Sequence, residues 1–225
     1  MNSYVKRILC ALIAAVLAFA CVACGGGSDK EESKQNASAE PASDPAGESK
    51  APEQGSIDLE GFSYRNESLG IGIKLDESWS IRTTEELAAL VGATSLGDAM
   101  KNAPITYDFY AVRPISSASI NIIFENMTKS VGKAFTESEY LDLAKTTVKA
   151  QVESAGMKVN SLEIIKRTVA GRELNGYAIE LFANGITVHE YCLLIRMGDY
   201  MANITLASGN AEELEQLLNA IYPLG

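Results

Sequence analysis

Residues 64–81 read YRNESLGIGIKLDESWSI, and this stretch decides the class of fold. Short apolar and aromatic runs alternate in it with glycine, asparagine and aspartate, which favour turns. We expect Phe62–Asn66 and Ile71–Leu75 to pair as a hairpin, and Trp79–Ile81 to form a short strand after the turn at Asp76. The fold therefore starts with antiparallel strands.

Helix-start signals follow this hairpin. Thr83 and Glu86 form a capping box ahead of an apolar run, and residues 95–98 repeat the pattern. The longest predicted helix covers residues 136–156, TESEYLDLAKTTVKAQVESAG, which open with a second capping box and end at Gly156. Apolar residues recur in it at helical spacing, so we expect it to pack on the core.

Alternation of apolar and polar residues predicts strands in the rest of the chain. Residues 105–113, ITYDFYAVR, and 119–126, SINIIFEN, are typical of half-buried antiparallel strands, with Tyr110 on the polar side. Later strands are expected at Glu163–Val169, Gly176–Ala183, Ile186–Met197 and Tyr200–Ala207. A last helix starts at Asn210, with Leu214, Leu217, Leu218 and Ile221 on one stripe.

This order of elements predicts an α+β fold, with a mostly antiparallel sheet flanked by helices on both faces in an α/β/α sandwich. It resembles the PsbP-like family, named for an extrinsic subunit of the photosynthetic oxygen-evolving complex. The residues that carry the resemblance are YRNESLGIGIKLDESWSI, TESEYL and VAGRELNGYAIEL, with Asp76 where the family usually has proline. The resemblance implies a fold and an accessory or assembly role, and it implies no reaction. The family's cation-binding residues have no counterpart here.

Residues 1–23 are typical of a secretion signal. Lys6 and Arg7 precede an uncharged run of 16 residues, Ile8–Ala23, which is short for a membrane-spanning helix. The segment resembles a bacterial lipoprotein signal, in which a cysteine becomes the lipid-modified first residue. We expect that residue to be Cys24, which glycines follow, with Cys21 as the alternative.

Residues 24–55 then form the lipidated cysteine and a tether. The 31 residues from Gly25 to Gly55 contain no aromatic or large aliphatic side chain, so we expect them to be disordered, with a reach of roughly 30 Å. Residues 56–225 form the folded domain. This organisation predicts a protein held by its lipid on the extracytoplasmic face of the cell membrane.

Charge and cysteine content exclude several classes of function. Residues 56–225 contain 22 acidic and 14 basic residues, a net charge of −8, which argues against binding nucleic acid. If Cys24 is lipidated, only Cys192 remains in the domain, so we expect no disulfide there. Cys192 lies in an apolar strand pattern and is expected to be buried and inert.

No set of catalytic residues is recognisable. His189 is the only histidine, and a lone histidine makes a poor metal site. It suits a partly buried, hydrogen-bonded position, and Glu190 is expected on the opposite face of the strand. The pairs Glu85–Glu86 and Glu212–Glu213 fall in the first turns of predicted helices, where they complement the helix dipole. We therefore expect no catalytic residue, no metal site and no cofactor, and ligand-binding residues stay unassigned.

Two functional hypotheses remain. The first is a non-catalytic lipoprotein whose domain binds a protein of the cell envelope or assists an assembly. The alternative is a sensor or scavenger that binds a small ligand or cation, and an enzyme is the least supported.

Overall fold

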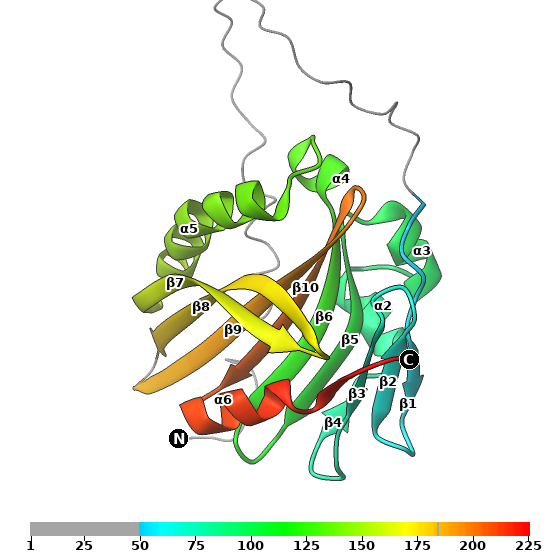
Figure 1. Cartoon of the computed structure of the whole chain (residues 1–225), viewed down its shortest axis with the longest axis horizontal. Helices are drawn as coiled ribbons and strands as arrows, with labels where there is room; N and C mark the ends of the chain where they lie inside the picture. Colours follow the sequence, from blue (N-terminus) through cyan, green and yellow to red (C-terminus); the bar gives the residue numbers. More distant parts are fainter. Residues whose placement is uncertain (1–49, 184) are drawn as a thin grey trace, which may run out of the picture.

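The computed structural model describes residues 50–183 and 185–225, which form an α+β fold built around one large sheet (Figure 1). The predicted signal segment, Cys21, Cys24 and the tether up to residue 49 lie outside the described residues. In the described part of the chain, no helix is long and apolar enough to cross a membrane.

The large sheet has seven strands in the order β4-β5-β6-β10-β9-β8-β7, and all its neighbours are antiparallel. This arrangement confirms the predicted mostly antiparallel sheet. Its strands are β4 (Ser80–Ile81), β5 (Ile105–Arg113), β6 (Ala118–Asn126), β7 (Lys158–Val169), β8 (Arg172–Ala183), β9 (Ile186–Met197) and β10 (Tyr200–Ser208).

A second sheet of four strands, which was not predicted, packs against the first. Its order is β1-β2-β3-β11, and its strands are β1 (Ser56–Asp58), β2 (Ser63–Asn66), β3 (Ile71–Lys74) and β11 (Ile221–Pro223). The pairing of β2 with β3 confirms the predicted hairpin. The predicted place of Ile221 on a helical stripe is wrong, because Ile221 opens β11 and pairs with Ile73.

Helices cover both faces of the large sheet, as predicted. On one face, α5 (Glu137–Ser154) packs on β7, β8 and β9, while α2 (Thr84–Leu90) and α3 (Leu96–Asn102) pack on β5. On the other face, α6 (Ala211–Leu218) lies beside the small sheet and contacts β10, β9 and β6. The short α4 (Met127–Val131) follows β6. The capping boxes of Thr83 and Thr136 are present, and Gly156 has a positive φ of 80°.

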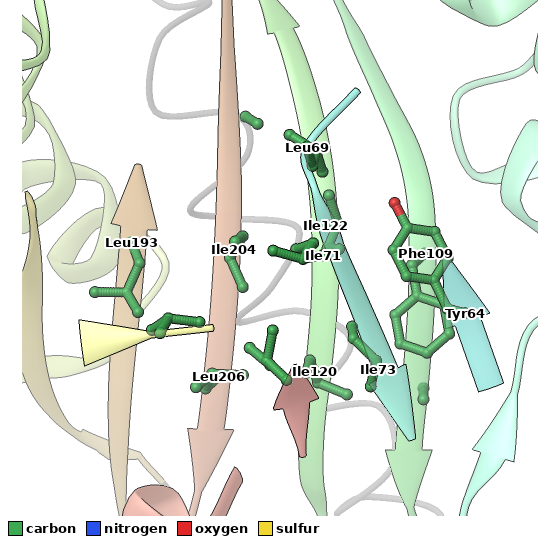
Figure 2. Close-up of a cluster of buried hydrophobic side chains, with 14 of the residues drawn as sticks. Tyr64, Leu69, Ile71, Ile73, Phe109, Ile120, Ile122, Leu193, Ile204 and Leu206 are labelled. Atoms are coloured by element: carbon green, nitrogen blue, oxygen red, sulfur yellow. The ribbon is translucent and has the colours of Figure 1, made fainter. Parts of the chain in front are cut away.

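The main core lies between the two sheets (Figure 2). Ile71 and Ile73 of β3 face Ile120 and Ile122 of β6, and all four are fully buried. Full burial of such a side chain stabilises a fold by about 1.5–3 kcal/mol, so this interface fixes the small sheet on the large one.

The prediction that β5 and β6 are half-buried is wrong. Every residue of β6 is buried, and in β5 the polar-side residues Asp108 and Tyr110 are 0% and 4% exposed. Tyr110 packs in a cluster with residues of α2 and α3. The reason is that both faces of these strands are covered, so the alternation of residue types does not mark a solvent-facing side.

Asp108 joins the two sheets and the start of the described chain. A bulge between Tyr107 and Phe109 shifts the register of β5 against β6 at this residue. The Asp108 carboxyl accepts hydrogen bonds from the Tyr64 hydroxyl, from Asn66 Nδ2 at 2.9 Å and from the Gly55 amide at 3.0 Å. Burial raises its pKa, although these bonds act in the opposite direction.

The contacts of the fold begin before residue 56. Pro52 is buried, Ala51 packs against the main core, and the Glu53 carbonyl accepts a hydrogen bond from Asn66. A Cβ atom at Gly55 would lie 2.2 Å from the Tyr64 ring, so a glycine suits this position. The sequence interpretation placed residues 51–55 in the tether, because nothing in their composition reveals that Asp108 binds Gly55 or that Asn66 binds Glu53.

Candidate functional site

The histidine and cysteine singled out in the sequence occupy structural positions. His189 is partly exposed, and its Nδ1 lies 3.5 Å from a carboxylate oxygen of Glu180 on the neighbouring strand. Cys192 is buried, as predicted, and burial raises the pKa of its thiol to about 12. A thiol with that pKa stays protonated at neutral pH and is a poor nucleophile.

The carboxylate pairs lie in the first turns of α2 and α6, as predicted. Glu213 also binds other elements, since its carboxylate accepts hydrogen bonds from Ser116 at 2.8 Å, Ser208 at 2.6 Å and Arg113 at 2.8 Å. Burial opposes ionisation of Glu213, but these donors outweigh it and lower the pKa. The Arg113 guanidinium lies 4.8 Å from the centre of the buried Trp79 ring, so this network supports the fold.

The described residues contain no group of three or more His, Cys, Asp and Glu side chains placed to hold a metal ion.

The most unusual group of residues lies on the α5 side of the large sheet, and we call it the polar strip. The register places two rows side by side across three neighbouring strands. Its residues are Asn121, Thr205 and Cys192 in one row, and Ser119, Ala207 and Glu190 in the next. All six are at most 6% exposed.

Two members of the polar strip are buried without a hydrogen-bond partner. Neither side-chain atom of Asn121 and neither carboxyl oxygen of Glu190 has one. Leaving such a group unpaired costs about 1–3 kcal/mol, and more for a charge. Burial raises the pKa of Glu190 well above its usual value, which favours the neutral acid. In native proteins nearly all buried polar groups form hydrogen bonds, so two neighbouring side chains without a partner on one sheet face need a physical explanation.

The polar strip adjoins two apolar clusters on the same sheet face, and its Cys192 and Ala207 belong to one of them. One cluster contains Val148 of α5 with Leu194 of β9, and the other contains Leu87 of α2 with Ile123 of β6. The strip carries short side chains, apart from Glu190.

Sequence reasoning missed the polar strip. Glu190 was placed correctly on the face opposite His189, but its burial was not foreseen. The available signal was that Glu190 alternates with Val188 and Cys192, so it shares the face of apolar residues. Asn121 gives a weaker signal of the same kind, because Ile123 follows it on its own face of β6.

A second feature is the edge of the large sheet at β7. Among the described strands, β7 pairs only with β8, so the backbone of a strand of 12 residues is unpaired on its outer side. Most of its side chains are exposed or partly exposed, including Ile164 at 41%. Its charged residues and the irregular register near Val159 and Ser161 are features that limit non-specific strand pairing.

No protein-family model matches the sequence, and no curated protein matches it. Solved structures with a similar course of the chain include cyanobacterial PsbP (CyanoP) from Synechocystis sp. PCC 6803, with a TM-score of 0.42, 11% identity, and coverage of 82% of this chain and 99% of that one. LpqN of Mycobacterium tuberculosis, described as involved in cell envelope biogenesis, has a TM-score of 0.35 and 10% identity, with coverage of 67% of this chain and 76% of that one. Protein PA94 of Pseudomonas aeruginosa, of unknown function, has a TM-score of 0.30 and 13% identity, with coverage of 66% of this chain and 83% of that one. At these low values the similarities carry no argument about what the chain does.

Proposed function

We propose that this chain is a lipid-anchored, extracytoplasmic accessory protein that acts by binding and not by catalysing a reaction. The signal-like residues 1–23, the cysteine at position 24 and the polar tether support the anchor. The roles of Cys192, Glu213 and Asp108 support a non-catalytic domain, because burial or structural hydrogen bonds occupy each of these reactive side chains.

The observation that carries protein binding is the unpaired edge of β7. An extended segment of another protein can add a strand to such an edge, and its backbone hydrogen bonds then supply affinity. The charged side chains of β7 oppose pairing with unselected sequences and leave a partner of complementary charge favoured. The partner expected from the anchor is a protein of the cell envelope.

Site-specific crosslinking in cells tests this proposal. The full-length lipidated protein carries a photo-crosslinking residue at Ile164 of β7 or, as the matched control, at Leu90 of α2, which is 50% exposed. A second control carries residues 1–55 alone. We expect a discrete protein adduct from position 164 only. Equal adducts from both positions, or turnover of a cell-envelope substrate by the purified protein, would contradict the proposal.

A second candidate function, the binding of a small ligand, is favoured by the unpaired Asn121 and Glu190. A bound molecule in the polar strip would satisfy both groups and would be enclosed between α5 and the α2–α3 pair. Any such ligand stabilises the folded state by mass action. A thermal-shift screen of metabolites and cations with the full chain therefore tests this function, and a flat screen across all classes would exclude it.

A further inference from the structure

We infer that the polar strip binds a small molecule with a primary ammonium group, which pairs with the carboxylate of Glu190 while a hydrogen-bonding group at its other end reaches Asn121 or Ser119. This inference rests on the small-ligand function proposed above. It names the class of ligand and the residues that hold it.

Charge is the first reason for a cation. The α5 side of the large sheet contains two buried carboxyl groups, Glu190 and Glu125. Glu125 has partners, since it accepts hydrogen bonds from Ser130 at 2.5 Å and from Tyr140 at 2.7 Å. Glu190 has no hydrogen-bond partner among the described residues. Both carboxyl groups lie near enough to Cys192 to oppose ionisation of its thiol. A positive guest beside Glu190 would give its carboxyl group the hydrogen-bond donors that it lacks and would favour its ionised form.

The donor set favours an ammonium group over a metal ion. Calcium takes six to eight oxygen ligands, and magnesium requires near-ideal octahedral coordination. The polar strip offers one carboxylate, one amide and the hydroxyls of Ser119 and Thr205, spread over three strands. An ammonium group carries one charge and three donors, which the two oxygens of Glu190 and one neighbouring hydroxyl can accept.

The register also sets the size of the ligand. Glu190 and Ser119 lie in one row, two strands apart, so their Cα atoms are about 10 Å from each other. Ala207 lies between them, so the side chain at the centre of the row is only a methyl group. An aliphatic chain of a few carbons has the length to span Ala207 and to place one polar group at each end of the row.

The test compares two molecules of the same length and different charge. The full-length protein, purified in detergent, is titrated with 1,4-diaminobutane and with 1,4-butanediol, and binding is measured by calorimetry and by the shift in melting temperature. The variants are Glu190→Gln, which keeps the shape of the side chain, and Asn121→Val, which suits a strand. The matched control is Glu125→Gln, a buried and fully partnered carboxyl group on the same sheet face.

We expect the diamine to bind and raise the melting temperature, and the diol to bind at least about tenfold more weakly, because hydrogen bonds to charged groups are the stronger ones. Glu190→Gln should weaken diamine binding by a similar factor, and Glu125→Gln should leave it unchanged. Binding of the diol as strong as that of the diamine, or undiminished diamine binding to Glu190→Gln, would overturn the amine inference and leave a small-ligand function standing. Failure of every compound class in the broader screen would overturn both.

Discussion

Replacing Asp108 with alanine tests how the two sheets are joined. The carboxyl group is fully buried and accepts from three donors: the Tyr64 hydroxyl, Asn66 Nδ2 and the Gly55 amide. In Asp108→Ala all three donors lose this acceptor: Asn66 Nδ2 keeps its bond to the Glu53 carbonyl, whereas the buried Tyr64 hydroxyl and the Gly55 amide lose the acceptor that holds them.

The magnitude follows from counting these donors. Each buried donor left without a partner costs about 1–3 kcal/mol, and removing a buried carboxyl group returns part of this sum. We expect a net loss of about 3–5 kcal/mol in the free energy of unfolding, a large share of the roughly 5–15 kcal/mol typical of a domain. Asp108→Asn keeps one acceptor oxygen and should cost less, about 1–2 kcal/mol.

Equilibrium unfolding of the purified protein in urea measures these losses, with the fluorescence of Trp79, the single and buried tryptophan, as the probe. The control is Asp142→Ala on α5, because Asp142 is exposed and forms only a 3.7 Å contact with Lys145. Limited proteolysis should also cut residues 51–55 faster in Asp108→Ala, since Gly55 is released. A loss in Asp108→Ala no larger than in the control would refute the role assigned to this carboxyl group.

Three further predictions use the same unfolding assay. Glu190→Gln should raise the free energy of unfolding at neutral pH. Because burial raises the pKa of Glu190, the wild type loses stability as the pH rises above the pKa of about 4.5 that this group has in the unfolded chain, and the variant lacks this loss. Equal pH profiles of the two proteins would contradict this prediction. Glu213→Gln should lower the free energy of unfolding by about 1–2 kcal/mol at pH 7. Because the pKa of Glu213 is lowered in the folded protein, the difference in stability between wild type and variant should shrink as the pH falls below about 4.5. A difference that stays constant with pH would contradict this prediction. Thr136→Ala should lose about 1 kcal/mol with its capping box, whereas Thr146→Ala, inside the same helix, should not lose stability by this mechanism, so equal losses would argue against the cap.

The features that the sequence predicted correctly are local ones. The capping boxes at Thr83 and Thr136, the hairpin around Gly70 and the stop at Gly156 depend on residues within a few positions of each other. The short strand expected at Trp79–Ile81 is also present, as β4 at Ser80–Ile81. Such signals depend little on tertiary contacts, because residues close in sequence set the backbone geometry that they favour.

The features that were missed depend on contacts between distant segments. Asp108 reads as a solvent-facing residue of β5 until the bulge at this position and the small sheet are known. Glu190 and Asn121 come together only through β10, which lies between their strands. Ile221 continues the apolar stripe of α6, but its pairing with Ile73 decides its conformation. In each case tertiary contacts override the local pattern.

The pairing of β3 with β11 bears on when this domain can fold. Residues 71–74 emerge early in synthesis, yet their second neighbour comes from residues 221–223, and the Leu224 amide also donates to the Gly70 carbonyl. The early hairpin therefore has an unfinished edge until nearly the whole described chain is available. Contacts of such large sequence separation slow folding. If the chain is exported as proposed, this slow closure keeps it unfolded during passage through the membrane.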